Sequence, residues 1–199
     1  MKVTREQAAR NRETVVDTAS RLFRERGVGG VGIADIMRES GLTHGGFYGQ
    51  FASKEELAAE ACTVALAASA EKWVGLAAQA RGGPEGDAAI FPAIAANYLR
   101  DAHVDAAGTG CALVALAADA ARSRGPVSAA FTQGMLALAA VLETAVPADA
   151  PARRETALAA MSQMMGALML ARAVDDPALA QDILSAARAA LGANPHPET

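Results

Sequence analysis

The chain has 199 residues, of which 52% are hydrophobic and 20% charged, and its formal net charge at pH 7 is −4. Alanine is abundant and β-branched runs are few, so the composition predicts an all-α fold rather than a sheet, and the length suits one domain or two small ones. The two cysteines, Cys62 and Cys111, form no close-spaced pair, so neither a disulfide framework nor a structural zinc module is indicated.

The first 26 residues predict a basic helix. They hold seven basic side chains against four acidic ones, whereas the rest of the chain is acidic. A basic end on an acidic body can orient a protein on phosphates, although each arginine taken alone also fits a solvated helix face. The first residues are polar and no apolar segment follows them, so no signal peptide is expected.

Residues 32–51 predict two short helices joined by a tight turn. The first helix has one apolar face, formed by residues spaced i, i+3, i+4 and i+7: Ile33, Ile36, Met37 and Ser40. Gly41 can adopt the left-handed conformation that ends a helix, and Thr43 can cap the next helix. Phe47 and Phe51 of the second helix are expected to pack on the first helix, which leaves the opposite side free for DNA.

The remainder of the chain predicts further helices at 54–80, 87–102, 111–122, 127–146, 153–174 and 177–191, separated by segments rich in glycine and proline. The first of these is expected to have an apolar side formed by Leu57, Ala61, Val64, Ala68 and Val74. The uncharged stretch 125–142 contains Pro126 and several polar residues, so it is interpreted as a buried core helix and not as a membrane span. A soluble cytoplasmic protein with no membrane partner is expected.

These residues together resemble the tetracycline-repressor (TetR-like) family of bacterial transcriptional regulators. The resemblance spans nearly the whole chain and rests on Val15-Val16-Asp17-Thr18-Ala19, Leu22-Phe23, Gly27, Ile36, Gly41-Leu42, Thr43, Gly45, Tyr48, Phe51 and Ser53-Lys54-Glu55-Glu56-Leu57. The chain departs from the family at Val31 and Gly32, where Thr or Ser is common, and at Gly46 and Gly49, where larger residues are common. The resemblance implies a three-helix DNA-binding head with a helix-turn-helix at residues 1–57. A helical ligand-binding and dimerisation body would follow at residues 58–199.

Two glycines in so short a second helix, Gly46 and Gly49, allow three interpretations. Each glycine inside a helix costs about 1 kcal/mol relative to alanine. The segment can bring its backbone close to a phosphate, it can become helical only on DNA, or the glycines can be tolerated without consequence.

The resemblance places the DNA contacts at Arg12, Gly32, Thr43, His44, Gly45, Gly46, Tyr48, Gln50 and Lys54. Tyr48 and Lys54 match phosphate contacts, and Arg12 could reach a flanking phosphate. Gln50 lies at the groove floor, where its amide can pair with adenine through two hydrogen bonds. A dimer would read a palindromic operator in double-stranded DNA whose halves lie roughly 34–36 Å, or a multiple, apart.

The resemblance also implies a small-molecule pocket among the body helices, where apolar walls carry a few polar groups. The expected contacts are Ile94, Tyr98, His103, Cys111, Leu113, Met135, Leu138, Met164 and Leu168, each of which also fits plain core packing. Cys111 lies before an apolar helix in a segment that resembles one in relatives that respond to electrophiles or oxidants. The helix N-terminus and the upstream His103 would favour its thiolate, whereas an inert buried thiol is the alternative, and Cys62 is expected in the core.

The last two predicted helices carry more apolar surface than one intramolecular contact needs. In the resembled family these helices pair with their copies to form a four-helix bundle. The expected interface residues are Leu158, Met161, Met165, Met169, Leu179, Ile183 and Leu191. Filling of a monomeric core is the alternative role for the methionines.

The sequence is therefore interpreted as that of a ligand-responsive transcriptional regulator, a repressor that is released from its operator by a small-molecule inducer. A thiol-based sensor that uses Cys111 is one alternative, and a helical enzyme or interaction scaffold is another. The sequence has no nucleophile elbow, phosphate loop or metal-binding helix, so no enzyme activity, cofactor or metal is expected.

Overall fold

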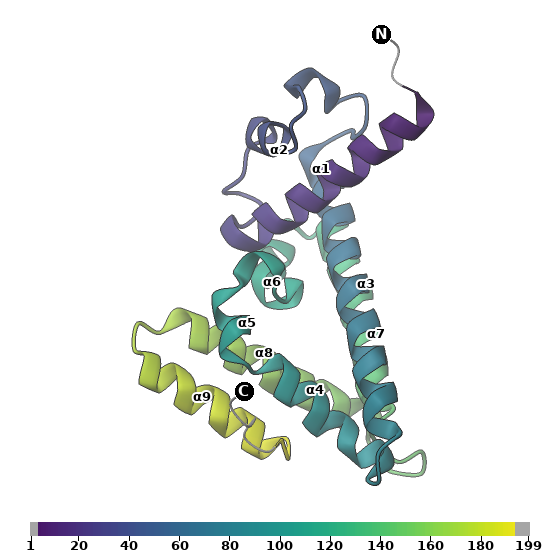
Figure 1. Ribbon diagram of the computed structural model, residues 1–199, viewed down its shortest axis with the longest axis vertical. Helices are drawn as coiled ribbons and strands as arrows, with labels where there is room; N and C mark the ends of the chain where they lie inside the picture. The colour runs from purple at the N-terminus through teal and green to yellow at the C-terminus, as the bar shows by residue number, and fades with distance from the viewer. Residues whose placement is uncertain (1–3, 194–199) are drawn as a thin grey trace. The chain divides into compact units, whose positions relative to one another are not determined.

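The computed structural model describes residues 4–193, and within this range the regular structure is entirely helical, without strands (Figure 1). The nine α-helices are α1 (Arg5–Arg26), α2 (Ile33–Glu39), α3 (Lys54–Arg81), α4 (Ile90–Tyr98), α5 (Asp101–Asp105), α6 (Ala112–Ser123), α7 (Pro126–Glu143), α8 (Arg153–Ala173) and α9 (Pro177–Ala190). Three 3-10 turns, η1 (His44–Gly46), η2 (Gly86–Ala89) and η3 (Ala107–Thr109), complete the set. The all-α prediction is thus confirmed. Lys2, one of the basic residues counted above, lies outside the described residues.

The chain packs into two compact units. The first unit comprises Met1–Leu66 and Ala107–Gln133, and the second comprises Ala67–Ala106 and Gly134–Thr199. Helices α3 and α7 each contribute residues to both units. The division of function expected at residue 57 stays a prediction.

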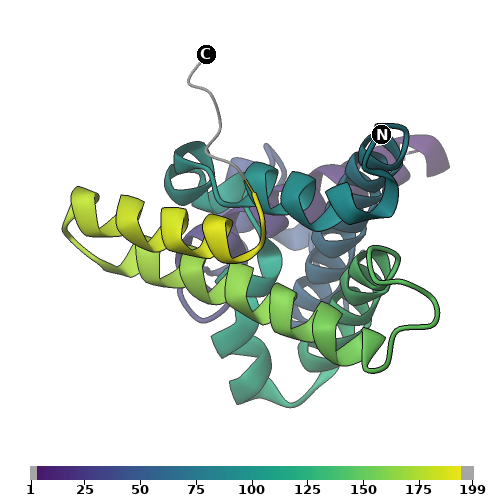
Figure 2. The ribbon, with the colours of Figure 1, turned by 90° about the horizontal axis from the view of Figure 1, so that it is seen from below.

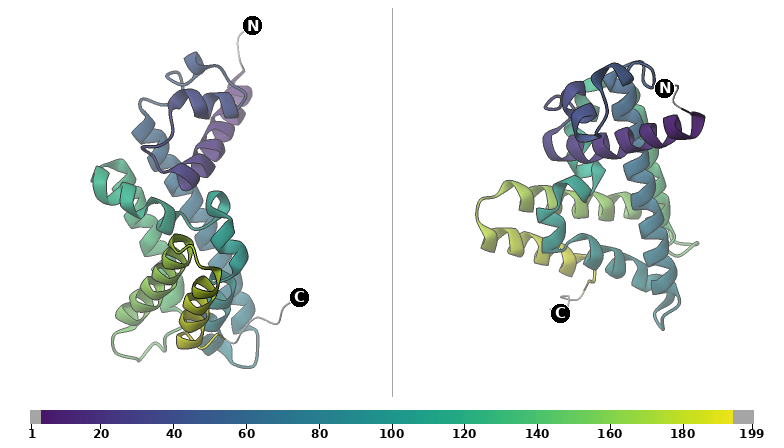
Figure 3. Two further views of the ribbon diagram at one scale, coloured as in Figure 1. Left: turned by 90° about the vertical axis from the view of Figure 1, so that its left-hand side faces the viewer. Right: turned by 45° about the horizontal axis from the view of Figure 1, so that its top comes forward.

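The first unit is built around α1, against which α2 and α6 pack (Figure 3). The side chain of Thr4 starts α1 by accepting a hydrogen bond from the amide of Gln7 at 3.2 Å. The core of the unit consists of apolar side chains that are at most 4% exposed: Val15, Val16, Ala19, Leu22, Phe23, Val31, Ile36, Met37, Phe47, Phe51, Leu57, Ala58, Ala61, Cys62, Leu66, Ala112, Leu113, Leu116, Ala120 and Val127. Several elements therefore share one core, which fixes the frame around the turn that follows α2.

In the second unit, α8 and α9 run side by side and antiparallel (Figure 2). Asp176 caps α9 by accepting from the amides of Ala178 and Leu179, and Pro177 takes the first helical position, where no N–H is needed. The expected helix 87–102 is divided into η2, α4 and α5. Its chain bends at Leu99 and Arg100, which leave helical geometry, whereas Pro92 is accepted in the first turn of α4.

Two expectations about apolar helix faces need correction. In α3, Val64 and Val74 are 43% and 56% exposed and Ala68 is exposed as well, while Trp73 is buried. Alanine residues of α3 lie on every side of the helix, so sequence periodicity does not identify its buried face. Helix α7 is the one described helix that is long and apolar enough to cross a membrane, which is weak evidence by itself, and only 22% of it is buried. This share is smaller than a buried core helix would have.

Candidate nucleic-acid interface

Helix α2 and the turn after it have the expected geometry of the first half of a helix-turn-helix. Gly32 precedes the helix in an extended conformation without a side-chain cap. Gly41 has a φ of +70°, and the amide of Leu42 donates back to the carbonyl of Met37 at 2.9 Å. The left-handed residue predicted at Gly41 is present, and it turns the chain toward residue 43.

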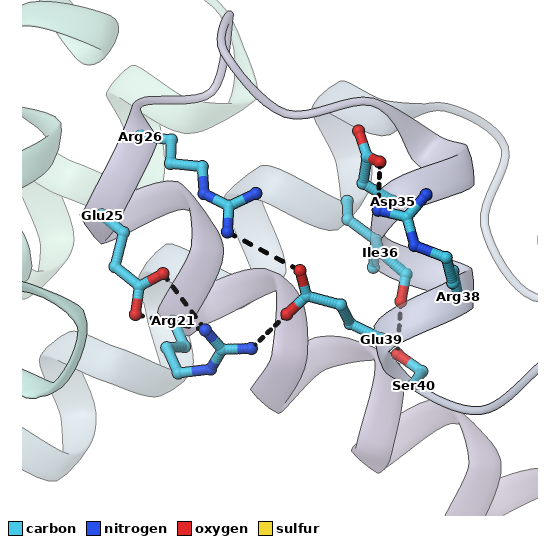
Figure 4. Close-up of polar contacts among 8 residues, drawn as sticks. All are labelled: Arg21, Glu25, Arg26, Asp35, Ile36, Arg38, Glu39 and Ser40. Atoms are coloured by element: carbon cyan, nitrogen blue, oxygen red, sulfur yellow. Dashed lines mark hydrogen bonds and ion pairs between the residues drawn. The ribbon is translucent and has the colours of Figure 1, made fainter.

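An ion-pair network joins α1 to α2 (Figure 4). Arg21 contacts Glu39 at 2.5 Å and Glu25 at 3.1 Å, and Arg26 lies 3.7 Å from the second carboxylate oxygen of Glu39. The hydrogen bonds to Glu39 and Glu25 raise the pKa of Arg21 above its usual value. Because Glu39 is shared by two arginines of α1, the network orients α2 and neutralises part of the basic charge of α1.

The segment 43–51, called the recognition segment below, follows this frame. Phe47 and Phe51 are 0% and 2% exposed, and their ring centroids lie 5.5 Å apart. Tyr48 is 65% exposed, and its ring centroid lies 5.1 Å from that of Phe47 and 6.3 Å from that of His44, both in edge-on contacts. The predicted division into buried phenylalanines and an exposed side is therefore present.

The prediction that an α-helix begins near His44 is wrong. The recognition segment contains only the 3-10 turn η1 followed by a second turn. Thr43 is extended, as a capping residue should be, but its side chain makes no capping hydrogen bond. Three glycines in seven residues, Gly45, Gly46 and Gly49, account for the missing helix, because each lowers helix stability by about 1 kcal/mol.

Arg12, expected at a flanking phosphate, is held by neighbouring groups. One η nitrogen donates to the carbonyl of Gln50, and the other donates to Glu60 at 2.5 Å. The guanidinium carbon lies 4.1 Å from the ring centroid of Phe51, a cation–π contact. Arg12 thus ties the end of the recognition segment to α1 and α3, and Glu60 is a member of this site that the sequence did not reveal.

Lys54 at the start of α3 has two backbone partners. Its Nζ donates to the carbonyls of Val28 and Val31 at 2.9 and 3.1 Å, which satisfies acceptors in the loop after α1. An ammonium group has three N–H donors, so these two bonds leave one N–H, and its contact with a phosphate stays a prediction. Of the other predicted contacts, Gly32, Thr43, His44 and Gly45 are exposed, and Gly46 and Gln50 are half-buried.

The comparisons with known proteins agree with this geometry. Residues 15–61 match the family model described as bacterial regulatory proteins, tetR family. The reduced form of Escherichia coli NemR is 20% identical with a TM-score of 0.75, covering 91% of this chain and 95% of that one. A TetR-family transcriptional regulator from Cytophaga hutchinsonii is 17% identical with a TM-score of 0.74, covering 96% and 97%. A TetR transcriptional regulator from Chloroflexus aurantiacus is 25% identical with a TM-score of 0.73, covering 94% of both chains. Residues 15–61 therefore resemble the corresponding region of the tetR family, and the chain has the same fold as these regulators. No curated protein matches it.

The predicted ligand contacts are mostly buried side chains. Residues at most 5% exposed are Ile94, Tyr98, Cys111, Leu113, Leu138, Met164 and Leu168. His103 and Met135 are half-buried, and Cys111 and Leu113 belong to the first unit, whereas the other seven belong to the second. A ligand role for these residues stays a prediction.

Three aromatic rings of the second unit meet around Tyr98. The Trp73 ring centroid lies 5.9 Å from that of Tyr98, and the His103 centroid lies 4.7 Å from it, both edge-on. His103 Nδ1 is 2.7 Å from the Tyr98 carbonyl oxygen. Burial lowers the pKa of His103, and the positive charge of Arg172 acts in the same direction. Trp73 is absent from the predicted set, because the many alanines of α3 hide which of its faces is buried.

A cavity of about 460 Å³ lies elsewhere in the second unit, among α5, the end of α8 and the start of α9. Its lining combines acidic, basic and apolar side chains, and none of the predicted ligand residues lines it: Asp101, Val104, Asp105, Ala171, Arg172, Val174, Asp175, Pro177, Ala180, Gln181 and Leu184. The guanidinium of Arg172 donates to the carbonyls of His103 and Val104 at 2.6 and 3.2 Å. Among residues 4–193 no three His, Cys, Asp or Glu side chains gather as a metal site would require.

The predicted interface residues of α8 and α9 differ in exposure. Met161 is 3% exposed and belongs to the core of the second unit, Met169 and Leu179 are 53% and 45% exposed, and the others are half-buried. Leu170, which was not predicted, is 51% exposed. The exposed side of this helix pair therefore differs from the predicted list at two residues: Met161 is buried, and Leu170 is exposed.

The two cysteines lie in the first unit in different surroundings. Burial raises the pKa of the Cys62 thiol to about 11. Cys111 is 5% exposed and occupies the residue before α6, where Arg24 donates to the adjacent carbonyl of Gly110 at 2.9 Å. The positive group beside Cys111 in its own unit is thus Arg24, whereas the predicted neighbour His103 belongs to the second unit.

Proposed function

We propose that this protein is a ligand-controlled transcriptional repressor that binds a palindromic operator as a homodimer. The observation that most directly supports this function is that α1, α2 and Arg12 hold the recognition segment with Tyr48 and His44 exposed. A small-molecule inducer would favour a state that does not fit the operator, and the coupling would be reciprocal. We further propose that it has no enzymatic activity and acts in the cytoplasm.

The outward face of α8 supports the homodimer. Its exposed or half-buried residues follow one helical stripe with spacings of three and four: Ala159, Ser162, Gln163, Gly166, Met169, Leu170 and Ala173. A Cβ added at Gly166 would meet nothing within 4 Å, so the stripe is open where another helix could approach closely. Half-exposed methionine and leucine side chains beside small residues fit a helix pair of a second copy.

Selection of bound sequences from random duplex DNA tests this function. The purified protein is expected to recover a palindrome, and the selected duplex should bind two chains, as measured by the mass of the complex. The same duplex then allows a screen for small molecules that release it. A folded protein that recovers no sequence would contradict the proposal.

A thiol-based sensor is the second candidate, and the observation that favours it is Arg24 beside Cys111. Among the similar structures, that of NemR is described as a reduced form. In this case N-ethylmaleimide should abolish binding of the selected duplex by the wild type and the Cys62→Ser variant. The Cys111→Ser variant should keep binding, and retained binding by protein alkylated at Cys111 would rule the candidate out.

A further inference from the structure

Most backbone hydrogen bonds of the recognition segment span three residues, whereas those of an α-helix span four. The amides of Gly46 and Phe47 donate to the carbonyls three residues before them, at 3.0 and 3.2 Å. Farther on, the amide of Phe51 donates to the carbonyl of Phe47 at 3.0 Å, which is already the α-helical spacing. The segment thus has a helical end at the phenylalanines and a tighter 3-10 beginning.

The side chain of Gln50 makes a hydrogen bond where an α-helix would have a backbone one. In an α-helix the carbonyl of Gly46 would accept from the backbone amide of Gln50. Here the side-chain Nε2 of Gln50 donates to that carbonyl at 3.3 Å, while the backbone amide donates to Phe47 instead. Gln50 Oε1 is buried and has no hydrogen-bond partner among the described residues, so the side chain is held in an arrangement that leaves a polar atom unsatisfied.

The three glycines of the segment are not required by its conformation or packing. None of Gly45, Gly46 and Gly49 has a positive φ. A Cβ would meet nothing within 4 Å at the first, the end of the Met37 side chain at 3.7 Å at the second, and a carbonyl at 3.8 Å at the third. Alanine would fit at all three positions. The glycines therefore act mainly by lowering the stability of a helix.

We propose that the recognition segment winds into an α-helix on DNA and thereby releases the side chain of Gln50 to read a base edge. In the α-helix the backbone amide of Gln50 donates to the carbonyl of Gly46 in place of the side chain. The freed side-chain amide can then offer both a donor and an acceptor to adenine. Arg12 and the two buried phenylalanines keep the end of the segment in place throughout. This inference rests on the proposed DNA-binding function.

The central test is a triple variant, Gly45→Ala with Gly46→Ala and Gly49→Ala, measured by fluorescence anisotropy. The probes are the duplex recovered by selection and an unrelated duplex of equal length. Each alanine is worth up to about fivefold in helix formation, so we expect the triple variant to bind the selected duplex between about tenfold and a hundredfold more tightly. Binding of the unrelated duplex should not change, because phosphate contacts alone do not require the helix.

Gly75→Ala is the matched control. Gly75 lies inside α3, and its added Cβ would also meet nothing within 4 Å, so this variant should leave both affinities unchanged. Gln50→Ala should reduce the preference for the selected duplex in both the wild-type and the triple-alanine background. Without DNA, the triple variant should show the added ellipticity at 222 nm that the wild type gains only on the selected duplex. If the triple variant folds poorly, Gly45→Ala alone should tighten binding by up to about fivefold.

The outcomes separate the two proposals. A wild-type protein that selects no sequence would overturn the proposed function and this inference with it. A wild type that selects a sequence, together with a well-folded triple variant that binds it no more tightly or that tightens equally on both duplexes, would overturn this inference alone.

Discussion

Lys54 offers a prediction in which structural and DNA-binding roles can be measured separately. Lys54→Met keeps most of the aliphatic stem and removes the donors to the Val28 and Val31 carbonyls. Hydrogen bonds to a charged group contribute about 1.5–3 kcal/mol each, and water can replace part of that at this half-buried site, so we expect the free energy of unfolding to fall by about 2 kcal/mol. If the third donor contacts a phosphate, the slope of log affinity against log salt should also flatten by about 0.9.

Urea unfolding measures the first effect, and anisotropy with the selected duplex at several salt concentrations measures the second. Lys72→Met is the control, because Lys72 lies exposed on the same helix and has none of these carbonyl contacts. Its unfolding free energy should change by less than about 0.5 kcal/mol. An unchanged stability of Lys54→Met would refute the role of the carbonyl bonds, and an unchanged salt slope would remove Lys54 from the DNA interface.

Three further predictions concern other parts of the molecule. Burial lowers the pKa of His103 below 6.5, so the unfolded chain takes up a proton before the folded one as the pH falls. The free energy of unfolding should therefore fall below pH 6.5, and His103→Gln should reduce that fall. Urea unfolding at several pH values measures both effects. Leu170→Glu should convert a dimer to a folded monomer in sedimentation experiments, whereas Val74→Glu, an equally exposed site on α3, should not. Glu39→Gln should lower stability by about 1 kcal/mol or less, and the loss should shrink in high salt if the ion pairs are its cause.

Local sequence signals were sufficient for the frame of the DNA-binding region. The spacing of Ile36 and Met37 placed the buried side of α2, and the left-handed preference of glycine marked its end at Gly41. The spacing of Phe47 and Phe51 separated the buried from the exposed side of the recognition segment. These features depend on residues within one or two turns of each other, which is the range over which periodicity and capping act.

Contacts between distant residues could not be predicted in the same way. The bond from Arg12 to Glu60 spans 48 residues, and the network that links Arg21 to Glu39 spans 18. Each arginine had several carboxylates within a plausible distance along the sequence, and only packing selects among them. In α3 the abundance of alanine removed the hydrophobic contrast that would have shown Trp73 to be buried and Val74 exposed.

Several arginines of α1 are engaged in contacts within the protein, and this limits what the basic first helix can contribute to DNA binding. Arg12, Arg21 and Arg26 are paired with carboxylates, and Arg24 donates to the carbonyls of Ser20 and Gly110. Arg24 is half-buried, and this burial lowers its pKa. Fewer of these charges are therefore available for phosphates than the sequence count suggests, so non-specific affinity and its salt dependence should be modest. Discrimination between sequences must then come mainly from the recognition segment, where helix formation and the release of Gln50 would occur together on the correct duplex.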